Sequence, residues 1–401
     1  MNHMSPTDTR QAEYLALLSA AALLQACASV PQPGGAAHAH TTAQTPEQAA
    51  RFLLQAQFSA SDAEIASVQS LGYRPWLEQQ FAAPAGPTGW EWLDARGYGE
   101  IHVDTHFFDR SYPGDYMIWN QLMTAPDPVR KRIALALSEF FVVSLNGLDI
   151  AWRSHTMAHY WDTLCAHAFG NYRNLLEAVT LHPAMGQYLN TRGNQKENPA
   201  TARLPDENYA REVLQLFSIG LYQLNPDGSE QRDAQGNRLE TYTQSDISNL
   251  ARVFTGYEFD QNANVVTELT ESKRKRKVGN RIYAQRPMVL VSNRHSELEV
   301  RFLGSTIPAK TSGMQALKQA LDTIFNHPNV GPFFARQMIQ RLVTSNPSTA
   351  YVARVAAAFA DNGAGVRGDL KAVFSAVLLD DEARGPEGLH HSSFGKVREP
   401  M

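Results

Sequence analysis

The stretch LPDENYAREVLQLFSIGLYQLNPDG, Leu204–Gly228, decides the fold class of this chain. At 100° per residue, one side of a helix over 206–220 collects the apolar side chains Tyr209, Val213, Leu214, Leu216 and Phe217. Gly220 is suited to ending such a helix, and the turn-forming sequence NPDG follows it. The pattern therefore predicts an amphipathic helix followed by a tight turn.

Four polar residues lie within two turns of this helix. Glu207 and Arg211, like Asn208 and Glu212, are spaced i,i+4 and can interact along the helix. Glu212 falls at the margin of the apolar side, where desolvation raises the pKa of a carboxyl group unless a cation or donor compensates. In one interpretation these groups tie neighbouring segments together. In the other they form a catalytic site that includes Glu207, with Glu212 as general base or metal ligand, Arg211 as anion clamp, and Asn208 and His295 as orienting or proton-transfer groups.

Helical periodicity continues on both sides of this stretch. The predicted helices cover residues 45–58, 59–73, 73–81, 127–145, 152–168, 172–181, 243–256, 313–325, 330–343, 348–360 and 368–379. Residues 221–224 and 238–242 flank a turn-rich segment and are predicted to pair as a small hairpin. Residues 260–300 form an irregular insertion of loops or short strands. The sequence thus predicts a mainly α fold, a single multi-helix globular domain over 46–401.

The composition excludes several classes of protein. Hydrophobic residues at 43% and charged residues at 19% fit a globular chain. The formal net charge of −4 indicates no general attraction to nucleic acid. There is no Gly-x-Ser-x-Gly elbow, Walker loop, dinucleotide fingerprint or Cys-x-x-Cys pair.

The N-terminal residues resemble an export signal. Tyr14–Ala26 is uncharged, too short to span a bilayer, and is followed at once by Cys27 in LLQAC, which resembles a bacterial lipobox. The prediction is a signal segment over 1–27, acylation at Cys27, a flexible linker over 28–45, and a periplasmic or lipid-anchored location in the cell envelope. The alternative is an ordinary frayed N-terminal helix, because Arg10 is offset by Asp8.

Several motifs occur together in one order along the chain. They are HAFGNYRNLLEAVTLHPAMGQYLN, LPDENYAREVLQLFSIGLYQLNPDG, YTQSDISNLARVFTGYEF, RFLGSTIPA, NHPNVGPFFARQMIQRLVTSNPSTAYVARVAAAF and GKVREP. Together they resemble the bacterial DUF1800 family over about residues 46–400. The resemblance implies a largely helical, exported protein with no established reaction, whose partner is a sulfatase-like exported protein. The family generally continues past REP, so a C-terminal segment is expected to be missing here. It also usually has an acidic residue where this chain has Ser296.

A second candidate site lies in SHTMAHYWDTLCAHAFGN. His155, His159 and Asp162 are spaced i, i+4 and i+7, so a helix places them on one stripe that can form one face of a divalent metal site. Further ligands would come from elsewhere, with His167, His182, Glu212 and His295 as candidates. The alternative is a solvated helix face.

Five consecutive cations, Lys273–Lys277, lie in the irregular segment. Such a run is usually a solvated loop, and it can also hold anionic lipid headgroups or an acidic polysaccharide. The functional prediction is a hydrolase that uses acid–base or metal-assisted chemistry. The alternative is a non-catalytic envelope protein that assembles with a partner.

Overall fold

The computed structural model of the chain describes residues 39–401 except 103, 272, 387–391 and 400–401. The predicted signal segment, Cys27 and most of the linker lie outside the described residues. The described helices of eight residues or more are α2 (Pro46–Ala56), α3 (Asp62–Leu71), α4 (Tyr73–Ala82), α6 (Tyr112–Thr124), α7 (Pro128–Phe140), α8 (Arg153–His167), α9 (Tyr172–Thr180), α11 (Asn208–Gln215), α12 (Gln244–Ala251), α13 (Gly313–Asn326), α14 (Val330–Leu342), α15 (Thr349–Ala360) and α16 (Leu370–Leu379). Shorter helices are α5 (Gly89–Asp94), α10 (Pro183–Tyr188) and α17 (Asp381–Arg384).

Local capping explains where several of these helices begin. Thr45 accepts from the backbone N–H of Gln48 at the start of α2, and Pro46 occupies the first helical position. The predicted pair at the start of α12 forms a full capping box. The Thr243 side chain accepts from the Asp246 N–H, and the Asp246 carboxylate accepts from the Thr243 N–H. These short-range rules act on neighbouring residues, so the sequence alone reveals them.

Several helices are shorter than predicted, and α7 and α11 show two ways in which a helix ends early. α7 ends at Phe140 because Phe141 leaves the helical conformation, and its carbonyl accepts from the Tyr160 hydroxyl at 2.6 Å. α11 ends at Gln215. The turn that follows is closed by hydrogen bonds from the N–H groups of Ile219 and Gly220 to the Leu214 carbonyl. Gly220 takes the left-handed conformation, with φ of 71°, that this ending requires.

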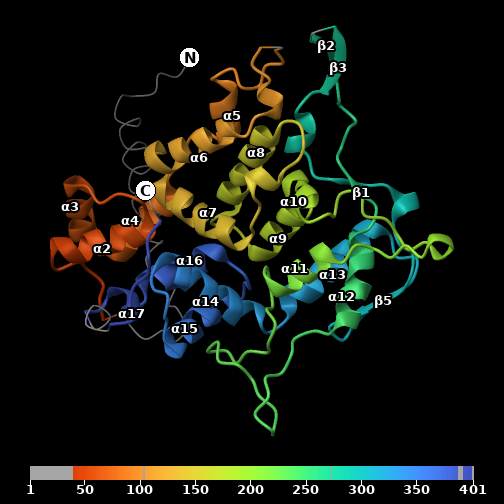
Figure 1. Cartoon of the computed structure of the whole chain (residues 1–401). Coiled ribbons are helices and arrows are strands. Elements are labelled where there is room, and N and C mark those ends of the chain that lie inside the picture. The colour runs from red at the N-terminus through yellow and green to blue at the C-terminus, as the bar shows by residue number, and fades with distance from the viewer. Residues whose placement is uncertain (1–38, 103, 272, 387–391, 400–401) are drawn as a thin grey trace, which may run out of the picture. The chain divides into compact units, whose positions relative to one another are not determined.

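α8 is the helix around which the upper part of the fold in Figure 1 is arranged. It packs against α5, α6, α7, α9 and α10. The helices α5, α6 and α10 were not predicted, because they are short or mix aromatic and polar residues without a clean apolar stripe. Packing on α8 thus stabilises helices whose own sequences are ambiguous.

A cluster of aromatic rings joins α8's neighbours to the C-terminal helices. The ring of Tyr172 at the start of α9 lies 5.1 Å from that of Phe334 in α14 and 5.4 Å from that of Phe359 in α15. Phe141 lies 5.5 Å from Phe217. α14, α15 and α16 pack on one another, and α14 also packs on α7. These buried rings each remove a large apolar area from water and join the two groups of helices.

Strands are few and short in the part of the chain the structure describes. Three antiparallel pairs form: β1 (Tyr257–Glu258) with β4 (Val289–Leu290), β2 (Val266–Glu271) with β3 (Arg274–Gly279), and β5 (Val300–Phe302) with β6 (Ser305–Ile307). The predicted hairpin after α11 is present only as isolated bridges, including Tyr222 with Glu240. The basic run, expected in a loop, lies largely on β3, where Glu268 is opposite Lys277. The fold is mainly α, as predicted.

Candidate functional site

The predicted site on α11 is largely a contact between α11 and α12. The Glu207 carboxylate accepts from Gln244 Nε2 at 2.7 Å and from Ser248 Oγ at 2.5 Å. Arg211 Nη2 donates to Glu207 at 3.3 Å and to Gln244 Oε1 at 3.2 Å. Glu207 and Arg211 therefore pair as their i,i+4 spacing predicts, and both hold α12 in place.

Asn208 and Glu212 lie on the same helix but outside this network. The Asn208 backbone N–H donates to the Asp206 carboxylate at 2.8 Å. Burial raises the pKa of the partly buried Glu212 carboxyl, and the charge of Arg211 opposes that rise. Among the described residues, Glu212 has no side-chain hydrogen bond, and none of the five described pockets includes it.

His295 is buried and has partners of its own. Its Nδ1 lies 2.9 Å from the Thr255 carbonyl and 3.3 Å from Thr255 Oγ1. Ser296 donates to the Glu197 carboxylate at 2.9 Å. Among the described residues, no hydrogen bond or ion pair joins His295 to Glu212, and His295 is bonded to Thr255 instead.

The predicted metal ligands point to different partners. His155 Nε2 lies 3.2 Å from Asp94 Oδ1, and Asp94 also binds Arg281 at 2.7 Å. Burial, and then the charge of Arg281, lower the pKa of His155 to about 4, although Asp94 opposes this. The Asp162 carboxylate accepts from the N–H groups of Gly89 at 2.7 Å and Trp90 at 3.0 Å.

Asp162 thus binds the N-terminus of α5, while burial raises its pKa to about 6. Among the described residues, no cluster of three or more His, Cys, Asp or Glu could hold a metal. His155, His159 and Asp162 are therefore not assembled into one metal site. Their spacing predicted a common stripe, but α8 is packed on several sides and each side chain binds a different neighbour.

A pocket of about 580 Å³ lies at His159, between α8, α9 and the segment 285–287. We call it the histidine pocket, and its lining residues are His159, Thr163, His167, Asn174, Glu177, Ala178, Leu181, His182, Gln285, Arg286 and Pro287. His159 Nδ1 and His182 Nε2 are 2.9 Å apart, and the two rings are stacked. Two of the histidines named as candidate donors, His167 and His182, therefore line the same pocket as His159, and His182 contacts it directly.

A backbone hydrogen bond indicates which ring nitrogen carries the proton in His182 and in His159. The Ala184 N–H donates to Nδ1 of His182 at 3.1 Å, so that nitrogen carries a lone pair. A neutral His182 must then carry its proton on Nε2 and donate it to Nδ1 of His159. His159 in turn carries its proton on Nε2, and its side chain lines this pocket.

Burial favours the neutral form of all three imidazoles. Burial lowers the pKa of His159 and of His167. It lowers the pKa of the fully buried His182 furthest, and the neighbouring His159 adds to this. Among the described residues, the His167 ring has no hydrogen-bond partner, so a lone pair is available to accept a proton.

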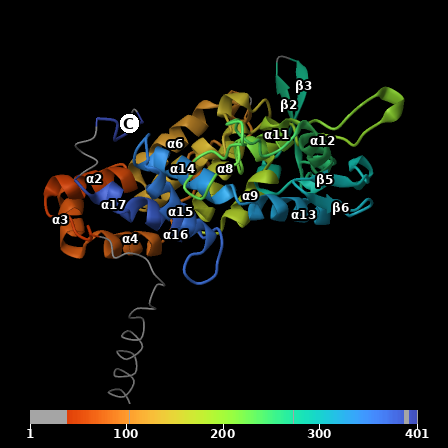
Figure 2. The same cartoon turned by 90° about the horizontal axis from the view of Figure 1, so that it is seen from below.

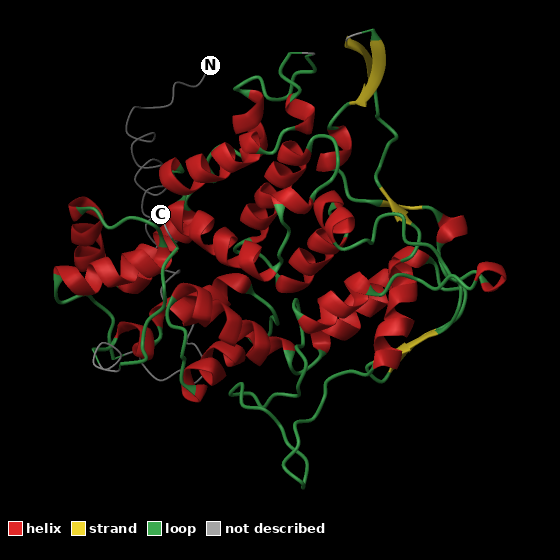
Figure 3. Ribbon diagram, in the orientation of Figure 1, coloured by secondary structure: helices red, strands yellow, loops and turns green. Residues whose placement is uncertain are grey.

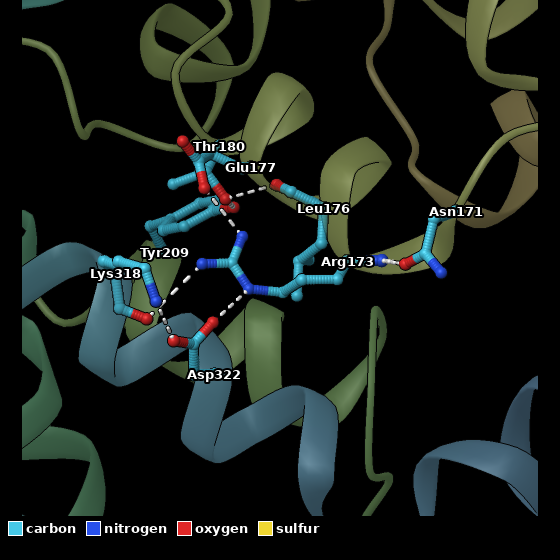
Figure 4. A network of polar contacts seen from close by, with 8 residues as sticks. All are labelled: Asn171, Arg173, Leu176, Glu177, Thr180, Tyr209, Lys318 and Asp322. Atoms are coloured by element: carbon cyan, nitrogen blue, oxygen red, sulfur yellow. Dashed lines mark hydrogen bonds and ion pairs between the residues drawn. The ribbon is translucent and has the colours of Figure 1, made fainter. Parts of the chain in front are cut away.

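A polar network holds the wall of the pocket formed by α9 (Figure 4). Arg173 binds Glu177 at 2.7 Å and Asp322 of α13 at 2.7 Å. Thr180 Oγ1 lies 2.7 Å from the Tyr209 hydroxyl of α11. Helix α11 is therefore joined to α9 by a hydrogen bond, and Glu177 of α9 lines the pocket.

The sequence contained one signal for this pocket that spacing alone did not reveal. His182 precedes Pro183 and accepts from the Ala184 N–H as the N-cap of α10. A histidine in that position has one nitrogen occupied by the backbone and presents the other to a neighbour. Its distance of 23 residues from His159 concealed the pairing.

Comparison with known proteins identifies the family. The family described as "Protein of unknown function (DUF1800)" matches residues 51–401. No curated protein and no solved structure matches the chain. Because the match covers nearly all of the sequence, the chain belongs to the DUF1800 family.

Proposed function

We propose that this protein is an exported or lipid-anchored hydrolase that uses acid–base chemistry in the histidine pocket. The observation that carries the proposal is the ordered chain from the Ala184 N–H through His182 to His159. It presents an N–H donor from a neutral imidazole at a pocket of about 580 Å³. Such a donor can stabilise the negative charge that develops when a carbonyl or phosphoryl group is attacked.

His167 supplies the complementary role of general base. It takes a proton from water while the water oxygen bonds to the electrophilic carbon or phosphorus. The Nε2–H of His159 hydrogen-bonds the resulting oxyanion. The bond to the leaving group then breaks, and that group takes its proton from the His167 imidazolium. His159 and His167 are separated by about 12 Å along the axis of α8. The mechanism therefore requires both side chains to turn toward a single reacting centre in the pocket that they line.

Assays with p-nitrophenyl esters and phosphates test this function. We expect His159→Gln and His167→Gln each to lower kcat/KM about 100-fold or more. The acid limb of the pH profile should have its midpoint below pH 6.5, because the pKa of His167 is lowered. His327→Gln is the control, since His327 is also partly buried with a lowered pKa but does not line this pocket. Wild-type rates in both pocket variants would exclude the pocket as the site.

Two features support a second candidate base, Glu212. Its pKa is raised by burial, and Asn208 and Arg211 are close by in the helix. If Glu212 is the base, Glu212→Gln abolishes hydrolysis and His159→Gln does not. A metal-assisted reaction is tested by metal analysis of the purified protein, and metal-free active protein would exclude it.

The competing proposal is a non-catalytic envelope protein that assembles with a sulfatase-like exported partner. It is favoured by the use of Glu207 and Arg211 as bonds between α11 and α12. No helix in the described part of the chain is long and apolar enough to cross a membrane. Co-purification of the two proteins, unaffected by His159→Gln, would support assembly over catalysis.

A further inference from the structure

One face of α6 exposes four large side chains with apolar bodies. Tyr112, Tyr116, Trp119 and Met123 are 39%, 56%, 46% and 75% exposed. Their spacing of four, three and four residues places them within one narrow stripe of the helix. We call them the α6 stripe, and it runs about 17 Å along the helix axis. Single exposed apolar residues are ordinary, but a continuous row marks an interaction surface.

The α6 stripe is continuous with the β2–β3 hairpin. The Tyr112 ring lies 6.5 Å from that of Phe107, which precedes α6. Asp109, two residues further along, forms an ion pair with Arg276 of β3 at 2.6 Å. His106 and Glu271 of β2 lie 3.5 Å apart. Two separate contacts thus hold the hairpin against the segment from which α6 begins.

The hairpin presents an excess of positive charge. It projects from the helical body in Figures 1 and 2, and its strands are in yellow in Figure 3. Ion pairs occupy Lys275, with Glu268 at 2.7 Å, and Arg276, with Asp109. Among the described residues, Lys273, Arg274 and Lys277 have no ion-pair partner, and all three are exposed. Three exposed cations without an ion pair therefore lie on a hairpin that contacts the segment from which α6 begins.

We infer that the α6 stripe and the β2–β3 hairpin together bind the surface of an anionic lipid bilayer. Tyrosine and tryptophan favour the boundary between water and hydrocarbon, because each has an apolar body and a polar tip. Lysine and arginine are attracted by anionic headgroups. The joint presence of exposed aromatic rings and uncompensated cations fits a lipid surface better than a protein partner, whose interface would be depleted of lysine.

Vesicle sedimentation tests this inference with the full chain carrying Cys27→Ser, which removes any acyl anchor at that position. The lipids are phosphatidylglycerol mixed with phosphatidylethanolamine, compared with phosphatidylcholine alone. We expect binding to the anionic vesicles only. Tyr116→Ser with Met123→Ser should weaken it about tenfold or more through lost apolar burial. Arg274→Gln with Lys277→Gln should weaken it about 25-fold, at roughly fivefold for each cation near the surface.

Matched controls change equivalent residues elsewhere. Leu204→Ser with Met314→Ser removes apolar side chains that are 78% and 51% exposed. Arg336→Gln with Lys310→Gln removes two exposed cations that, among the described residues, have no ion-pair partner. Both controls should bind as strongly as the starting protein. Equal binding to neutral and anionic vesicles, no binding to either, or equal losses in the controls and the α6 and hairpin variants would each overturn the inference.

Discussion

His182 donates from Nε2 to Nδ1 of His159 across 2.9 Å, while its own Nδ1 accepts from the Ala184 N–H. His159 should consequently be the Nε2–H tautomer, which nitrogen-15 NMR of the imidazole detects directly. His182→Ala removes the donor and exposes Nδ1 of His159 to water. We expect the pKa of His159 to rise toward 6.5 in that variant. The opposite tautomer in the wild-type protein would contradict the proton assignment.

Acid should destabilise the protein through His155. Its pKa is about 4 in the folded chain and about 6.5 when unfolded. Below pH 6.5 the unfolded state therefore binds a proton that the folded state does not, so stability is lost as the pH falls toward 4. Between pH 7 and pH 5 this amounts to about 2 kcal/mol. Urea denaturation at both values should show that His155→Phe loses less stability than wild type, and an equal loss would exclude this source.

Asp162 should give stability the opposite dependence on pH. Its folded pKa of about 6 exceeds the unfolded value of 3.8, so its contribution to stability decreases as the pH rises from 4 to 6. Asp162→Ala leaves the N–H groups of Gly89 and Trp90 without an acceptor, which should cost about 2 kcal/mol at pH 7. Asp162→Asn keeps one acceptor and should cost less. The control is Asp149→Asn, because that carboxylate is fully exposed. Unchanged thermal stability of Asp162→Ala would show that the bonds at α5 contribute little.

Gly256 should not tolerate alanine. Its φ is 85°, and an added Cβ would lie 3.0 Å from the His295 N–H nitrogen and 3.0 Å from the Val291 carbonyl oxygen. Both obstacles are backbone atoms, so Gly256→Ala should destabilise the fold by more than about 2 kcal/mol. Gly236 has a similar φ of 84° with nothing nearby, so Gly236→Ala should cost only about 1 kcal/mol. Equal melting temperatures for the two variants would rule out the steric argument.

The polar residues of α11 should separate into two groups. Glu207→Ala removes the bonds to Gln244 and Ser248 and should cost about 1 kcal/mol, because the network is partly exposed. Glu212→Gln should change stability by less than about 0.5 kcal/mol, since its side chain forms no hydrogen bond among the described residues. Chemical denaturation measures both. A larger cost for Glu212→Gln would place that side chain in a contact the structure does not show.

The helices were predictable wherever local chemistry determines them. Thr243 with Asp246 begins α12 as predicted, because the capping box acts within a few residues. The end was predicted less well, because α12 stops at Ala251 and a 3-10 turn over Arg252–Phe254 precedes Gly256. The Glu207–Arg211 pair likewise follows from the helical repeat. By contrast, α6 was missed because its stripe of Tyr112, Tyr116 and Trp119 is exposed, which differs from the usual amphipathic pattern.

The histidine pocket depends on contacts between distant segments. Helical spacing correctly placed His155 and His159 on α8, but could not show that His155 binds Asp94 while His159 binds His182. The hydrogen-bond partner of each histidine comes from a different segment that packs against α8. The sequence therefore supplied the chemical groups, and tertiary structure determined how they combine.

The loop between α11 and α12 is a suitable site for attaching a label. It extends below the body in Figure 1, and at its tip the Asp233 carboxylate accepts from the N–H groups of Gln235 and Asn237. Gly236 there has no neighbour within 4 Å of an added Cβ. A fluorophore or affinity epitope attached at this self-contained tip would report on the protein in its native surroundings without perturbing the packed helices.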